Sequence, residues 1–228
     1  MTIPFQIVGF DLDGTLLDTS RDLGAAVNHA LALVGREPVA HKALSGLIGG
    51  GARLMLQRAL TLTGGERDID QDALFAELLV YYEAHIADYT APYPGAIAML
   101  DALAGAGIKL AVVTNKREHM ARLLFDTLDL SARFTCIIGA GQYPLKPAPD
   151  ALLAMVRGCG GGRAAYVGDT TFDVRAAKAA GLPCVAVSFG FNDLPADQLG
   201  ADAVIDHFDQ LVPALGRLQG HAIRAALA

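Results

Sequence analysis

The chain has 228 residues, which is enough for one large domain or for a core with a smaller unit attached. Hydrophobic residues make up 53% of the sequence. This content favours a filled core over a disordered chain. The formal net charge is −6, and the sequence holds no block of Lys or Arg. We therefore expect no nucleic-acid partner and no anionic membrane partner.

The cysteines and the start of the chain indicate a cellular compartment. Cys136, Cys159 and Cys184 lie far apart in the sequence and form no CxxC pair, which is typical of reduced thiols in the cytoplasm. Residues 1–10 lack a basic patch followed by a long apolar stretch. No run reaches the roughly 18 apolar residues of a membrane helix. The sequence predicts a cytoplasmic protein, as a monomer or a homodimer.

The first half of the chain changes from one strand to a helical pattern. An apolar run over Ile7–Phe10 predicts a buried strand. After Leu17, apolar residues recur at spacings of three and four, which predicts a first helix. A second helix is expected after the turn Gly49-Gly50-Gly51, and a third carries apolar residues from Phe75 to Ile86. The segment Pro92-Tyr93-Pro94-Gly95 ends this helical stretch.

In the second half, helix and strand patterns alternate. A helix is predicted over 96–104, and strands are predicted at 109–114, 136–138, 166–167 and 184–187. Such alternation predicts βαβ units in a doubly wound, mostly parallel, Rossmann-like sheet. The first strand must join this sheet. We therefore predict a catalytic core of residues 1–17 and 92–228, with an inserted all-helical cap domain over 18–91.

Two acidic clusters follow buried strands of this predicted sheet. Asp11 and Asp13 come after the first strand, and Asp169 and Asp173 follow the strand at 166–167. Ligands bind at the carboxyl ends of strands in open α/β sheets. Carboxylates that converge there repel one another unless a cation joins them, and Mg²⁺ prefers oxygen ligands together with substrate phosphate. The sequence thus predicts a magnesium site that handles a phosphate.

The residue types also indicate chemistry. A carboxylate such as Asp11 can attack phosphorus, and a second one, Asp13, can protonate the leaving oxygen and later activate water. Thr114 and Asn115 end a strand and can hold phosphate oxygens, although Thr-Asn is also common turn chemistry. Lys146, in a proline-stiffened segment, would offset the negative charge of the site. The alternative for this lysine is a solvated position in a loop.

Asp169 and Asp173 are four residues apart, across the start of a helix predicted over 172–180. This spacing places both on nearly one face, close to the positive end of the helix dipole. Asp169, directly after the strand, is the better metal ligand. Asp173 has a second explanation as a partner of the helix dipole.

Taken together, the segments resemble the motif set of the haloacid dehalogenase superfamily, in which most members are phosphatases. The quoted motifs are Asp11-x-Asp13-Gly14-Thr15, Thr114, Lys146 and Gly168-Asp169-x3-Asp173, in the expected order. The resemblance implies that Asp11 is the nucleophile, that Asp13 is the general acid and base, and that Lys146 steadies the phosphoryl group. It implies phosphate binding by Thr114 and Asn115. Magnesium would be held by the Asp11 carboxylate, the Asp13 carbonyl and Asp169, with Asp173 in support.

Within that superfamily the chain most resembles the phosphoglycolate phosphatases. The segments that carry this resemblance are Phe10 to Asp18, Pro92 to Gly95, Val112 to Lys116, Tyr166 to Asp169 and Ala176 to Gly181. The resemblance implies hydrolysis of the small phosphorylated substrate 2-phosphoglycolate through an aspartyl-phosphate. Arg53, at the start of a cap helix, would meet a substrate carboxylate, or else is a surface arginine.

Three other activities stay open at this point. A phosphatase for another small phosphate ester, such as a sugar phosphate, would suit the same core. A phosphosugar mutase of the same superfamily shares the core motifs. A phospho-receiver signalling module also gathers acids, a Thr and a Lys on a doubly wound sheet, but it has no place for the helical insertion.

Overall fold

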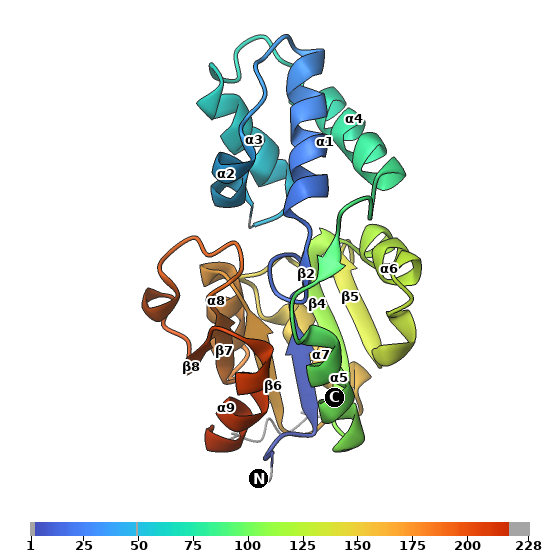
Figure 1. Ribbon diagram of the computed structural model, residues 1–228, viewed down its shortest axis with the longest axis vertical. Helices are drawn as coiled ribbons and strands as arrows, with labels where there is room; N and C mark the ends of the chain where they lie inside the picture. The colour runs from blue at the N-terminus through green and yellow to red at the C-terminus, as the bar shows by residue number, and fades with distance from the viewer. Residues whose placement is uncertain (1–2, 49, 219–228) are drawn as a thin grey trace.

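The computed structural model describes residues 3–48 and 50–218 (Figure 1). The chain forms a lower unit built on a sheet and an upper unit of helices. Within these described ranges, no helix combines the length and the apolar character that a membrane crossing requires. Gly49, which the sequence places in the turn before the second helix, lies outside the described residues.

The lower unit is built on a sheet whose six described strands are all parallel, in the order β5-β4-β1-β6-β7-β8. The strands are β1 (Ile7–Phe10), β4 (Lys109–Arg117), β5 (Cys136–Ala140), β6 (Ala164–Gly168), β7 (Cys184–Val187) and β8 (Ala203–Ile205). The chain therefore winds outward in both directions from the central strand β1. The predicted doubly wound, Rossmann-like fold is confirmed.

Helices cover both faces of this sheet because strand side chains point alternately to the two faces. In β4, Leu110 and Val112 pack into one buried cluster, and Ala111 and Val113 pack into the other. The first cluster includes side chains of α5 (Ala96–Gly105), α6 (Glu118–Thr127) and α9 (Leu211–Arg217). The second includes those of α7 (Asp150–Gly158) and α8 (Thr171–Ala179). The 3-10 turns on this unit are η2 (Ser131–Arg133), η3 (Ala196–Gln198) and η4 (Phe208–Gln210).

The helical unit lies between β2 (Leu17–Asp18) and β3 (Ala91–Pro92), which pair antiparallel where the chain leaves and re-enters the core. Its elements are α1 (Ser20–Leu33), α2 (His41–Leu44), the 3-10 turn η1 (Ser45–Leu47), α3 (Ala52–Leu62) and α4 (Gln71–Ala84). This unit faces the carboxyl ends of the strands (Figure 1). It is thus placed over the edge of the sheet at which ligands bind in such folds.

Asp22, in the first turn of α1, fastens the base of the helical unit. Its side chain is buried, and its carboxylate accepts hydrogen bonds from the backbone N–H of Tyr89 at 3.1 Å and of Thr90 at 2.8 Å. The Thr90 hydroxyl also donates to it, at 2.7 Å. Because residues 89–90 directly precede β3, this carboxylate joins the two connections between the units.

Element ends differ in places from the sequence-based expectations. Strand β4 extends to Arg117, and α4 ends at Ala84, so that Ile86 lies beyond it. Strand β8 was not predicted. Cys136 and Cys159 are far apart in sequence, but the fold brings their Sγ atoms to 3.8 Å as free thiols.

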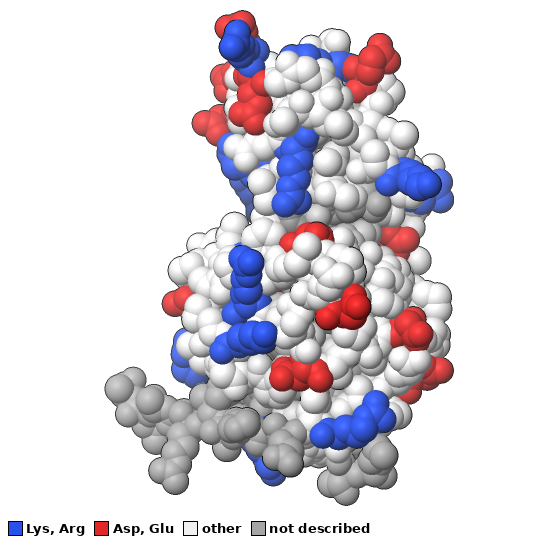
Figure 2. All heavy atoms as spheres, turned by 90° about the vertical axis from the view of Figure 1, so that its left-hand side faces the viewer, with Lys and Arg blue, Asp and Glu red and all other residues white. Residues whose placement is uncertain are grey.

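The charged residues of the surface are mixed in sign. Figure 2 shows Lys and Arg interspersed with Asp and Glu over one face of both units, with a narrowing between them. The net charge of −6 is therefore not separated into large single-sign areas on this face.

Candidate active site

Three neighbouring strands end at the same edge of the sheet and bring polar residues together. The last residue of β1 lies level with Val112 of β4 and with Val167 of β6. Asp11, Thr114 and Asp169 follow these positions by one or two residues. Parallel pairing of the three strands therefore places side chains that are far apart in the sequence in one crevice beneath the helical unit.

Lys146 lies at the centre of this crevice, in the loop between β5 and α7, and its side chain is 3% exposed. Its ammonium donates to Asp11 Oδ1 at 2.7 Å and to Asp173 Oδ1 at 2.6 Å. The Tyr166 hydroxyl at 3.0 Å and the Val113 carbonyl at 3.1 Å complete its surroundings. Burial disfavours the ammonium, but the carboxylates outweigh this effect and raise the pKa of Lys146. The lysine is a buried, charged member of the site and not a solvated loop residue.

Asp169 is held rigidly from two sides. The Thr15 hydroxyl donates to its Oδ1 at 2.8 Å, and the Phe191 N–H donates to its Oδ2 at 2.7 Å. Gly14 has a φ of +82°, and a Cβ there would lie 2.3 Å from Asp169 Oδ2. Glycine is therefore required after Asp13 by both the turn and the approach of this carboxylate.

Asp173 combines a structural contact with a contact in the site. Its Oδ2 accepts from the Thr170 N–H at 3.0 Å and from the Thr170 hydroxyl at 2.6 Å, within the capping box that begins α8. Its Oδ1 accepts from Lys146. Capping orients this carboxylate at the start of α8, and its role in support of a metal stays a prediction.

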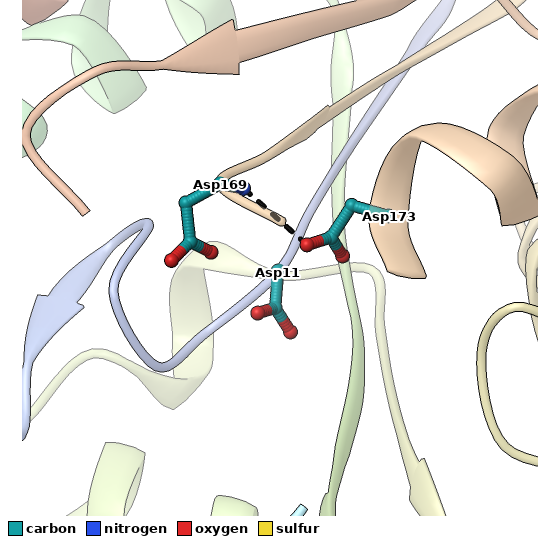
Figure 3. A group of neighbouring side chains, drawn as sticks. All are labelled: Asp11, Asp169 and Asp173. Atoms are coloured by element: carbon teal, nitrogen blue, oxygen red, sulfur yellow. Dashed lines mark hydrogen bonds between the residues drawn. The ribbon is translucent and has the colours of Figure 1, made fainter. Parts of the chain in front are cut away.

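The carboxylates of Asp11, Asp169 and Asp173 form one buried group (Figure 3). Each offers an oxygen that lies within 4.8 Å of the others. Burial raises the pKa of Asp11 to about 6 although Lys146 lowers it, and burial together with the other two carboxylates raises the pKa of Asp169. One ammonium cannot neutralise three carboxylates. A divalent cation with oxygen ligands fits both the donor set and the missing positive charge.

Asp13 forms an ion pair with Lys116, a residue for which the sequence predicted no role. Lys116, near the end of β4, donates to Asp13 Oδ1 at 2.7 Å and to Oδ2 at 3.0 Å, and its side chain is 4% exposed. Its Nζ also lies 4.6 Å from the centre of the Tyr82 ring, which belongs to α4. Because lysine side chains are usually solvated, the sequence did not indicate this contact. Its one hint was that Lys116 follows Thr114 and Asn115 at the end of a strand.

The structure places Thr114 and Asn115 at the crevice but gives Asn115 a further contact. The Asn115 side chain accepts from the Lys146 N–H at 2.8 Å and donates to the Lys146 carbonyl at 3.1 Å. This pair of bonds fixes the backbone that carries the buried ammonium. Thr114 is buried, and its hydroxyl accepts from the Lys116 N–H at 3.2 Å. Phosphate binding by these two residues stays a prediction.

Arg53 lies at the rim, where α3 begins. Its side chain is 49% exposed, pairs with Asp72 at 2.7 Å and lies over the Phe75 ring at 4.3 Å. Both neighbours belong to the helical unit. A substrate contact by Arg53, which stays a prediction, would compete with this ion pair.

A cavity of about 270 Å³ lies between the two units. Its floor includes Asp11, Asp13, Thr114, Lys116 and Lys146, and its roof includes Leu23, Met55, Phe75, Leu79 and Tyr82. Pockets for drug-sized ligands span about 300–1,000 Å³. The volume therefore favours a small substrate whose polar end meets the floor.

Comparison with known proteins agrees with this geometry. Residues 8–187 match the model of the haloacid dehalogenase-like hydrolase family. The phosphoglycolate phosphatase of Agrobacterium fabrum is 42% identical over 211 residues, 90% of each chain. That of Caulobacter vibrioides is 40% identical, over 88% of this chain and 86% of its own. The crystal structure of a predicted phosphoglycolate phosphatase from Haemophilus somnus is 29% identical, with a TM-score of 0.85, over 93% of this chain and 98% of the other. The chain therefore belongs to the haloacid dehalogenase-like hydrolase family, and it is a hydrolase that resembles the phosphoglycolate phosphatases of that family.

Proposed function

We propose that this protein is a magnesium-dependent phosphomonoesterase that hydrolyses 2-phosphoglycolate to glycolate and phosphate. One observation carries the proposal: the Asp11 carboxylate ends the central strand at the floor of a small cavity, with its Oδ1 held by Lys146. Relatives named phosphoglycolate phosphatase, at 42% and 40% identity, support the substrate. The core of residues 1–17 and 92–228 and the cap of 18–91 are part of the proposal.

The proposed reaction has two displacements. Lys146 holds Asp11 Oδ1, which leaves Oδ2 to attack phosphorus and form an aspartyl-phosphate as the ester bond breaks. Asp13 gives its proton to the leaving glycolate oxygen and then takes a proton from the water that attacks the aspartyl-phosphate. Thr114 and Asn115 bind phosphate oxygens, and Arg53 faces the substrate from the cap. The apolar roof of the cavity limits competing water during the first step.

Magnesium is the proposed cofactor, held by Asp11, the Asp13 backbone and Asp169, with Asp173 in support. The raised pKa values of Asp11 and Asp169 support a cation at this place, because ionised carboxylates without a counter-charge are unfavourable there. When bound, the ion neutralises phosphoryl charge and lets the carboxylates approach it. The same proposal places the enzyme in the cytoplasm, acting on a small phosphorylated substrate without a nucleic-acid or membrane partner.

Magnesium should stabilise the protein more at pH 7.5 than at pH 5. Burial raises the pKa of Asp11 from 3.8 to about 6, so the native, metal-free protein retains a proton that the unfolded chain releases. Metal-free stability therefore falls as the pH rises from about 4 to 6, by on the order of 3 kcal/mol for this group. Above pH 6 the ionised carboxylate can accept the ion. Melting temperatures with Mg²⁺ and with chelator, at both pH values, measure the difference.

Sodium chloride at matched ionic strength is the control, because it screens surface charges but does not take the place of a divalent ion among the carboxylates. A magnesium-induced shift of the same size at pH 5 and at pH 7.5 would contradict the assignment of Asp11 as a ligand.

The activity is tested by phosphate release from a panel of small esters, with Mg²⁺ and with chelator. We expect 2-phosphoglycolate to have the highest kcat/KM and the chelator to abolish turnover. Preference for a sugar phosphate would support the proposed reaction but contradict 2-phosphoglycolate as the substrate. Turnover that requires a sugar bisphosphate and releases no net phosphate would identify a mutase instead. The cap and the family membership leave no support for a receiver module.

A further inference from the structure

Several cationic side chains line the cavity of a protein that is negative overall. Among the described side chains that line it, four are cations and two are carboxylates, whereas the whole chain has a net charge of −6. The cations are Arg53, Lys116, Arg117 and Lys146. Lys146 is engaged with the carboxylates at the phosphoryl end. Lys116 and Arg53 are paired with Asp13 and Asp72 and lie outside the Asp11–Asp169–Asp173 group, so a second anionic group on the substrate can share one of these cations.

Lys116 is the cation placed beside the leaving group. Its ammonium contacts both oxygens of Asp13, the carboxyl proposed to protonate the ester oxygen. In a phosphorylated 2-hydroxy acid, a single carbon separates that oxygen from the carboxylate. A substrate with its ester oxygen at Asp13 therefore brings its carboxylate within reach of the Lys116 ammonium, which has three N–H donors.

Tyr82 supplies an independent observation from the opposite wall. The residue lines the cavity, is 2% exposed, and its hydroxyl makes no hydrogen bond to any described residue. Burial raises the pKa of Tyr82 to about 12, so the hydroxyl keeps its proton, and the Lys116 Nζ lies 4.6 Å from the centre of the Tyr82 ring. A buried polar group without a partner is costly to the fold. A ligand in the cavity that reached this buried hydroxyl would supply the acceptor that it lacks.

We propose that Lys116 and Tyr82 form the carboxylate-binding subsite of this enzyme and select phosphate esters of short hydroxy acids over phosphate esters of uncharged alcohols. One carboxylate oxygen accepts from the Lys116 ammonium and the other accepts from the Tyr82 hydroxyl. Lys116 belongs to β4 of the core and Tyr82 to α4 of the cap. The acid group of the substrate thus bridges the two units and favours their closed arrangement. The inference rests on the proposed function and names the residues that determine its substrate class.

Arg53 is the competing candidate, and its surroundings argue against it. It is half exposed and already paired with Asp72, whereas Lys116 is buried next to the reacting carboxyl. Exposed ion pairs are screened by solvent, so a rim arginine contributes less to selection than a buried ammonium.

The sharpest test is Tyr82→Phe, which removes the hydroxyl and keeps the ring. The measured quantity is the ratio of kcat/KM for 2-phosphoglycolate to that for propyl phosphate, an ester of similar size that has no carboxylate. We expect Tyr82→Phe to lower this ratio about tenfold or more, since a hydrogen bond to a charged group is lost. Its melting temperature should not fall, because the hydroxyl has no partner in the free protein. Tyr81→Phe is the matched control, since that ring stacks between His29 and His85, away from the cavity.

Lys116→Met tests the ammonium. It should lower kcat/KM for both esters, because Asp13 loses its partner, and should lower the ratio about a hundredfold. Lys116→Arg should restore part of it, and Arg53→Met should change the ratio less than Lys116→Met. An unchanged ratio in Tyr82→Phe and Lys116→Met, with wild-type preference for 2-phosphoglycolate, would overturn the subsite alone. A wild type that releases phosphate without preferring 2-phosphoglycolate would overturn both the subsite and the proposed substrate. A wild type that is inactive on both esters would overturn the phosphatase proposal as well.

Discussion

Replacing Asp11 by Asn is expected to abolish phosphate release, with kcat lowered by about 10⁴-fold or more, without lowering the melting temperature. The amide has nearly the shape of the carboxylate, and its oxygen can still accept the Lys146 hydrogen bond now made by Oδ1. It cannot form the aspartyl-phosphate. Burial of the carboxylate raises its pKa to about 6, so removing the charge should leave metal-free stability unchanged or raised. Phosphate release and thermal unfolding, both with purified protein, measure the two effects.

Asp22→Asn is the matched control, because it makes the same chemical change at another buried aspartate. Its carboxylate accepts from the Tyr89 and Thr90 backbone and from the Thr90 hydroxyl, and an amide cannot satisfy all of these donors. We expect a loss of about 1–3 kcal/mol in the free energy of unfolding. If Asp11→Asn instead lowered stability as Asp22→Asn does and retained turnover, Asp11 would be a structural residue.

The contacts that could be predicted from the sequence depend on strand ends. Asp11 and Asp169 each follow an apolar run, and parallel strands must bring their carboxyl ends to one edge. No detailed register was needed for that step. The fold class followed equally from the alternation of helix and strand patterns after residue 92.

The contacts that could not be predicted depend on side chains that look ordinary in sequence. Tyr82 belongs to the apolar pattern of α4. That its buried hydroxyl lacks a hydrogen-bond partner can be seen only once the helical unit is packed on the core. Lys116 is separated from Asp13 by 103 residues. Asn115 has the residue type of a phosphate ligand, but its contacts with the Lys146 backbone depend on the path of the loop after β5. Local patterns carry no information on such distant pairs.

Replacing Lys146 by Met is expected to remove both activity and a large part of the stability. The ammonium donates to Asp11 and Asp173 from a site where its side chain is 3% exposed. Breaking a buried ion pair by deleting one partner costs about 3–5 kcal/mol, because the remaining charge is left without compensation. For a chain of this size the melting temperature should fall by about 10 °C. We expect kcat to fall about 10³-fold, since the group that offsets phosphoryl charge is lost.

Two measurements on Lys146→Met distinguish a loss of catalysis from unfolding: activity at low temperature, and the effect of magnesium on the melting temperature. Activity is measured well below the melting temperature of Lys146→Met, where circular dichroism confirms the native helix content. Magnesium should raise the melting temperature of the variant more than that of the wild type, because two of the three buried carboxylates then lack their ammonium. A folded variant with kcat within tenfold of the wild type would contradict the role of Lys146. Equal magnesium shifts in the two proteins would contradict the view that lysine and cation neutralise the same carboxylates.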